Sequence, residues 1–129
     1  MTFEESLVVK LSFIKEISAK VFPLDAQEGT KAPYITYQLN NNDRTMVHSG
    51  FDGLIKGEYQ IDIFHNSYKN LKTLTGLVLT EIKTWLFTTM AITGPYISDL
   101  KIINQVETYD PETKLYQSTI DIEVYYKEV

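Results

Sequence analysis

The sequence predicts an α+β domain in which an antiparallel sheet of about four main strands is covered by two helices, in the order α-β-β-α-β-β. Apolar residues recur at three- and four-residue steps in two segments, which is helical spacing. In other segments they alternate with polar residues, which is strand spacing. The length of 129 residues suits a single domain, residues 1–129, with one core.

Two helices are expected, at residues 3–20 and after Asn66 or Ser67. Pro23 prevents continuation of the first helix, and residues 24–33 are expected to form a surface loop. The second helix is expected to end between residues 88 and 94, and its Trp85 is expected in the core rather than on a ligand platform. The apolar faces consist of Leu7, Leu11, Ile14 and Ile17 in the first helix and Leu71, Leu74, Val78, Ile82 and Trp85 in the second.

Four strands are expected, at residues 34–39, 58–64, 96–109 and 116–127. The pair Ile102 and Ile103 interrupts the alternation of the third strand and predicts a bulge. Pro111 and Asp110 predict a turn at residues 110–114 and hence a long antiparallel hairpin. Residues 40–57, rich in asparagine and glycine, are expected to project as a long loop that carries function.

Composition excludes several classes of function. The net charge of −5 and the pI near 5.0 disfavour nucleic-acid and anionic-lipid binding. The chain has no cysteine, which excludes thiol nucleophiles and thiolate metal sites. The acidic start of the chain is unlike a signal peptide, and charged residues within residues 71–92 argue against a membrane span. The sequence therefore predicts synthesis in a cytoplasm and no membrane partner.

No pattern in the sequence predicts catalysis, a cofactor or a metal. His48 and His65 lack the spacing of metal ligands, and Ser49 lacks the Gly-x-Ser-x-Gly elbow of a nucleophile. Acidic residues on predicted strands, which include Asp62, Asp121 and Glu123, are expected to keep a wet face soluble and to pair weakly across strands. We therefore expect a protein that is not an enzyme and that has no catalytic, cofactor-binding or metal-binding residues.

Two segments of the chain resemble a known family. They are residues 21–38 (VFPLDAQEGTKAPYITYQ) and residues 109–118 (YDPETKLYQS). Together they resemble the tail-completion or tail-terminator (head-to-tail joining) proteins of long-tailed bacteriophages and prophages. The resemblance implies a structural protein that forms a homo-oligomeric ring, typically a hexamer, at the head-proximal end of the tail tube, where it terminates the tail and joins it to the head.

The resemblance also implies partners and a place in the virion. Expected partners are other copies of the chain, the tail tube protein and a neck or head-completion protein, while DNA passes through the ring without being bound specifically. The protein is expected in the host cytoplasm during assembly and then in the tail or neck of the virion. Within residues 40–57, the candidate interface residues are Arg44, His48, Phe51, Asp52 and Lys56.

Two alternatives stay open at this stage. The first alternative to a tail terminator is another neck or tail protein, such as a stopper or a tube subunit. The second is a small ligand-binding or enzymatic domain. The second alternative would use a cleft around Tyr37, Tyr59 and His65. Indefinite polymers would indicate a tube subunit, and a monomer with a deep pocket would indicate a ligand-binding domain.

Overall fold

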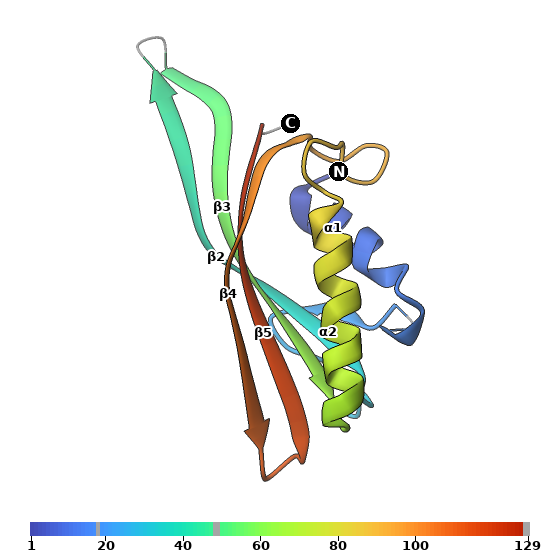
Figure 1. Cartoon of the computed structure of the whole chain (residues 1–129). Helices are drawn as coiled ribbons and strands as arrows, with labels where there is room; N and C mark the ends of the chain where they lie inside the picture. The colour runs from blue at the N-terminus through green and yellow to red at the C-terminus, as the bar shows by residue number, and fades with distance from the viewer. Residues whose placement is uncertain (18, 48–49, 128–129) are drawn as a thin grey trace.

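The computed structural model describes residues 1–17, 19–47 and 50–127, with the backbone alone for residues 45–47, 51 and 52. It confirms the α+β class. Both helices lie on one face of a five-stranded sheet (Figure 1). The elements are α1 (Phe3–Ser12), the 3-10 turn η1 (Lys15–Ile17), β1 (Val21–Pro23), β2 (Tyr34–Val47), β3 (Gly50–His65), α2 (Tyr68–Lys83), β4 (Ile97–Asp110) and β5 (Leu115–Lys127).

The sheet has the strand order β1-β2-β3-β5-β4 and is mixed, because β1 pairs with β2 in parallel while the other pairs are antiparallel. The four main antiparallel strands of the prediction are therefore present, and the sheet has in addition the short parallel edge strand β1. Three residues are too few to show strand alternation, so the sequence pattern gives no sign of β1. Its pairing, Val21 with Ile35, depends on how the loop at residues 24–33 returns the chain to the sheet.

The first helix is shorter than predicted. Thr2 and Glu5 form a capping box at its start, but α1 ends at Ser12 with Phe13 as its C-cap. The chain then tightens, with i to i+3 hydrogen bonds from the N–H of Ile14 to the carbonyl of Leu11 and from the N–H of Ile17 to the carbonyl of Ile14, both 3.1 Å. Ile17 is fully buried in spite of this change of geometry, so its apolar spacing indicated burial correctly.

The second helix agrees well with its apolar stripe. The Ser67 hydroxyl caps it by accepting the N–H of Asn70 at 3.4 Å, and α2 ends at Lys83, slightly before the predicted end. Trp85, just beyond the helix, is fully buried, which confirms its place in the core. Within the described part of the chain, no helix is long and apolar enough to cross a membrane.

The core lies between the two helices and the sheet. Phe3 is at the centre of an aromatic cluster, with ring centroids 4.7 Å from Tyr59, 5.4 Å from Tyr126 and 6.2 Å from Trp85. One face of β5 points into this core, as its alternating pattern predicts, because Ile120, Ile122 and Val124 are all fully buried. The opposite face of the sheet carries no helix in Figure 1.

The predicted loop at residues 40–57 is instead a paired extension of β2 and β3. The register continues from Asn41 opposite Glu58 to Val47 opposite Gly50, with irregularities after Leu39 and after Arg44. Asparagine and glycine are typical of turns, but here each strand gains cross-strand hydrogen bonds that the local pattern does not reveal. This extension, the arm, projects beyond the body of the molecule (Figure 1).

The bulge predicted at Ile102 and Ile103 is confirmed. The register of β4 with β5 shifts between Ile102 and Asn104, and a second shift lies between Ile97 and Asp99. Such bulges bend and twist an edge strand, and β4 is the last strand of the sheet.

Candidate assembly surfaces

Of the five residues that the sequence predicts as an interface, Arg44 and Lys56 have described side chains, and these lie on different faces of the arm. Arg44 pairs with core-facing Ile55 and lines a cleft on the helix side, whereas Lys56 is on the opposite face, with Nζ 3.8 Å from Glu123 Oε2. Phe51 and Asp52 lie in β3, where the backbone alone is described. His48 lies outside the described residues. The arm thus offers two different surfaces.

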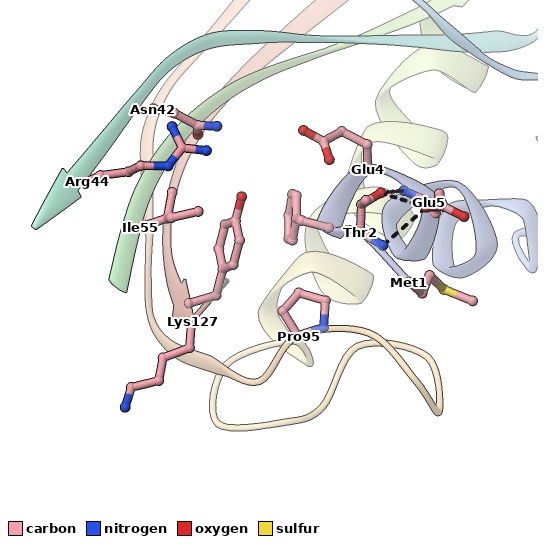
Figure 2. A pocket seen from close by; sticks show the side chains of 11 residues that line it. Met1, Thr2, Glu4, Glu5, Asn42, Arg44, Ile55, Pro95 and Lys127 are labelled. Atoms are coloured by element: carbon pink, nitrogen blue, oxygen red, sulfur yellow. Dashed lines mark hydrogen bonds between the residues drawn. The ribbon is translucent and has the colours of Figure 1, made fainter. Parts of the chain in front are cut away.

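A cleft of about 420 Å³ lies between the base of the arm and the first turn of α1. Figure 2 shows Asn42 and Arg44 on the arm side and Glu4 and Glu5 on the α1 side. The floor is apolar and consists of buried Phe3, Ile55, Pro95 and Tyr126. The charged rim consists of Glu4, Glu5, Arg44 and Lys127.

Hydrogen bonds connect the cleft to the core. The Tyr59 hydroxyl donates to Glu4 Oε1 at 2.7 Å and lies 3.3 Å from the Tyr126 hydroxyl. Burial raises the pKa of Tyr59 far above its ordinary value, and its hydrogen bonds to Tyr126 and Glu4 add to the shift. These contacts attach α1 to β3 and β5, so both walls of the cleft have fixed positions.

The tyrosine cleft of the alternative interpretation does not coincide with this cavity. Tyr59 is fully buried, and the His65 imidazole at the end of β3 contacts the Asn66 side chain, with Nδ1 3.0 Å from Oδ1. Neither Tyr37 nor His65 lines the cleft shown in Figure 2. In the described ranges there is also no group of three or more histidine and acidic side chains that could hold a metal ion.

The uncovered face of the sheet carries a polar network. Asp62 accepts hydrogen bonds from Thr119 at 2.6 Å, from Gln60 at 2.9 Å and from Gln117 at 3.0 Å. The Tyr125 hydroxyl donates to Glu123 Oε1 at 2.6 Å, and this bond is the main cause that raises the pKa of Tyr125 to about 12. These bonds satisfy Asp62 and Glu123, which are both buried, with 7% and 9% of their surface exposed, whereas the sequence predicts that they lie on a wet face.

The ionised form of Asp121 is disfavoured on this face. Burial, and then repulsion from Asp62, raise the pKa of its carboxyl above the ordinary value. A raised folded-state pKa means that this group favours folding at low pH and loses that contribution as the pH rises through the folded-state pKa. We therefore expect Asp121→Asn to stabilise the protein at pH 7 by about 0.3 kcal/mol, a small effect because water screens the repulsion.

Urea denaturation at several pH values from 4 to 8 tests this prediction. The advantage of Asp121→Asn should shrink as the pH falls toward 4. Asp62→Asn is the matched comparison and should be destabilising, because an amide nitrogen replaces an oxygen that accepts hydrogen bonds from Thr119 and Gln117 or from Gln60. A constant advantage of Asp121→Asn across this pH range would contradict the assignment.

The sheet leaves strand edges exposed on both sides. On one side β1 covers only residues 35–37 of β2, so the outer edge of the arm has no partner strand among the described residues. On the other side β4 is the last strand, and it exposes Ile103, Val106 and Tyr109 by about half, at 53%, 45% and 49%. Exposed strand edges are templates for pairing with another chain.

The sequence pattern does not reveal the cleft. Its walls come from residues 1–5, from the arm, from Pro95 and from the end of β5, and these segments meet only in the folded chain. Of the predicted interface residues whose side chains the structure describes, Arg44 lines it and Lys56 does not. The acidic residues Glu4 and Glu5 are the one feature of the sequence that could have pointed to the cleft. Acidic residues are also common in the first turn of a helix, so on their own they do not indicate a cleft.

Comparison with known proteins agrees with this architecture. The chain resembles in fold a chain from a solved structure described as the virion of a native gene transfer agent particle, with a TM-score of 0.70, 10% sequence identity, and coverage of 97% of this chain and 94% of that chain. No curated protein matches the sequence significantly. The family described as tail completion protein gp17 matches residues 11–127. The chain therefore belongs to the tail completion protein gp17 family and is a structural protein of the tail or neck of a bacteriophage-like virion.

Proposed function

We propose that this protein forms a closed homo-oligomeric ring, a hexamer, at the head-proximal end of the tail tube, where it terminates the tail and joins it to the head. The observation that carries the proposal is the pair of exposed strand edges, the outer edge of the arm and β4, on opposite sides of the same sheet. A head-to-tail ring covers both edges in every subunit and leaves no free end.

The uncovered sheet face supports a position around a channel. On this face Asp121 is only partly buried, whereas Asp62 and Glu123 are buried, and the chain as a whole carries a net charge of −5. This negative field would keep DNA mobile in the channel because like charges repel its phosphates. In this proposal the protein acts without catalysis, its partners are the tube protein and a neck protein, and it enters the virion after assembly in the host cytoplasm. If the acidic face were found on the outside of the ring, the channel assignment would be wrong.

The mass of the purified protein in solution tests the ring. We expect light scattering over a wide range of concentrations to show one discrete oligomer, or a monomer that assembles only after tail tubes of the cognate tube protein are added. Electron microscopy should then show the protein at one end of each tube. Indefinite polymers would indicate a tube subunit instead. A monomer that ignores tubes at every concentration would overturn the proposal.

A further inference from the structure

The outer edge of β2 becomes free at the base of the arm. β1 covers residues 35–37, and the N–H of Leu24 donates to the carbonyl of Tyr37 at 2.8 Å. Beyond Tyr37 this edge has no partner strand in the part of the chain that the structure describes. Residues 38–43 contain no proline, so their outward N–H and carbonyl groups form a template on which another strand can pair.

The outer edge of β4 is covered at its start. The N–H of Phe87 donates to the carbonyl of Ile97, and the N–H of Ile97 donates to the carbonyl of Thr88, both at 2.9 Å. From residue 98 onward β4 is the last strand of the sheet and contains no proline. This free edge exposes about half of Val106 and Tyr109, whereas unpaired edges are usually protected by charges or proline. Another strand is therefore expected to cover it.

The directions of the strands decide how the two edges meet. β2, β3, β5 and β4 are successive neighbours in the sheet and each pair is antiparallel, so β2 and β4 run in opposite directions. A head-to-tail ring brings the β2 edge of one copy to the β4 edge of the next without turning either copy over. The two strands then meet antiparallel, which is the slightly more stable arrangement.

The covered stretches require a stagger between neighbouring copies. Across the sheet Arg44 is level with Ile97, and Asp43 is level with Asp99. An unstaggered neighbour would set Arg44 against the covered start of β4 and would place two aspartates opposite each other. The neighbour must therefore slide toward the turn between β4 and β5, which lies at the end of the molecule opposite the arm (Figure 1). Closing a sheet into a ring requires such a stagger.

Two half-exposed side chains indicate the length of this slide. Leu39, 44% exposed, and Tyr109, 49% exposed, both lie on the helix side of the sheet, because they pair with core residues Tyr59 and Tyr116. Leu39 is level with Ile122 of β5 and Tyr109 with Tyr116, so a slide of six residues along β5 brings them together. An even number of residues keeps every side chain on its face.

We propose that residues 38–43 of one copy pair antiparallel with residues 106–110 of the next copy, with Leu39 beside Tyr109. The irregularity after Leu39 accounts for the extra residue on the arm side. This inference rests on the proposed ring and specifies one of its subunit contacts, a sheet that continues from copy to copy.

The register is favourable for the side chains on both faces. On the helix side the Tyr109 ring packs against Tyr116, with ring centroids 4.6 Å apart, and Leu39 of the neighbour extends this apolar contact. On the other side Asp43 of the neighbour lies beside Val106 and is moved away from Asp99. The pairing thus covers exposed apolar surface and avoids the like-charge contact.

Hydrogen exchange tests the backbone pairing. We expect amides within residues 38–43 and 106–110 to exchange about tenfold or more slowly in the assembled protein than in the monomer, because pairing gives free N–H groups a partner. If assembly requires tubes, the comparison is made with and without tubes. A contact through side chains alone would leave these rates unchanged and would contradict the proposed pairing.

Cross-linking tests the register, because the chain has no native cysteine. One preparation carries Leu39→Cys and a second carries Tyr109→Cys, and the two are mixed under the conditions of assembly with a mild oxidant. Residues directly opposite on paired strands are close enough for a disulfide. We expect a dimer from the mixture and none from either variant alone. Leu39→Cys mixed with Leu77→Cys, on the exposed face of α2, is the control and should give none.

A charge exchange gives an independent readout. Leu39→Asp should raise the concentration needed for assembly about tenfold or more, because pairing would bury a carboxylate beside Tyr109. Tyr109→Lys in the same chain should restore assembly at least in part, because the two charges then face each other between copies. Leu77→Asp is the matched control, since Leu77 is 41% exposed, and it should assemble normally. The unfolding midpoint of each monomer is measured to separate assembly from folding.

The outcomes separate this inference from the proposed function. Rings that form and cap tubes without amide protection, without the disulfide between positions 39 and 109, or with Leu39→Asp at normal strength would overturn the strand pairing and leave the ring in place. A dimer from Tyr109→Cys alone would indicate a two-fold contact between β4 edges and would also overturn it. If the unmodified protein neither assembles nor binds tubes, the proposed function is wrong and this pairing is overturned with it.

Discussion

Replacement of Trp85 by alanine is expected to destabilise the protein by about 3–5 kcal/mol, the range for deletion of a large aromatic side chain from a core. Trp85 is fully buried and packs edge-on against Phe3, with ring centroids 6.2 Å apart and an angle of 81° between the planes. Its indole N–H donates to Glu81 Oε1 at 3.2 Å. The substitution leaves a cavity where α1, α2 and the sheet meet, and the surrounding groups can fill it only in part.

Urea denaturation followed by far-ultraviolet circular dichroism measures this effect, because Trp85 is the only tryptophan and its fluorescence disappears with it. Trp85→Phe is the control. It keeps most of the apolar volume and should cost roughly 1–2 kcal/mol through the smaller ring and the lost hydrogen bond. A loss below about 1 kcal/mol for Trp85→Ala would show that this side chain is not a core residue.

Replacement of Gly94 by alanine is expected to cost about 2–3 kcal/mol and to lower the melting temperature by roughly 8 °C. The N–H of Gly94 donates to the carbonyl of Met90 at 2.8 Å, which brings the two backbones close together. An alanine Cβ at position 94 would press into the Met90 carbonyl oxygen and would lie 2.9 Å from Ser6 Cβ. Because the obstacle is backbone and not a flexible side-chain end, the loop or α1 must move.

Gly76 supplies the matched control for this prediction. It lies in the interior of α2 on an exposed face, and an added Cβ would meet nothing within 4 Å. Gly76→Ala is therefore expected to stabilise the protein by roughly 0.5–1 kcal/mol, since alanine has the higher helix propensity and restricts the unfolded chain. The two substitutions should have opposite signs in the same denaturation experiment. Equal effects would contradict the close packing at Gly94.

The strand alternation and the helical stripes were read correctly where one face of an element is buried in the core. In β5, Ile120, Ile122 and Val124 are buried on one face, and α2 buries Leu71, Leu74, Val78 and Ile82. Burial of one face imposes a period on the sequence, so such elements can be predicted from a single chain. The family was also recognised from the sequence, because turn and strand-start residues at 21–38 and 109–118 are local features.

The arm is the main feature that local patterns misrepresent. Residues 40–57 have the composition of a loop, yet the inner strand of the arm pairs on both sides as far as Ile55, with Arg44 of β2 and with Tyr126 of β5. Strand β1 was missed for a related reason, because its three residues are ordered by Ile35 and its neighbours in β2. Hydrogen bonds to a distant partner decide both cases, and no periodicity within the segment records them.

The sequence alone therefore determined the α+β class, the two helices, the core faces of the strands, and the resemblance to tail-completion proteins. Only the tertiary structure decided that residues 40–57 are an arm, that the sheet has a parallel edge strand, and that α1, the arm, Pro95 and β5 enclose a cleft. The physical reason is the range of the interactions. Burial of a face repeats within a segment, whereas strand partners and cavity walls depend on contacts between residues far apart in the chain.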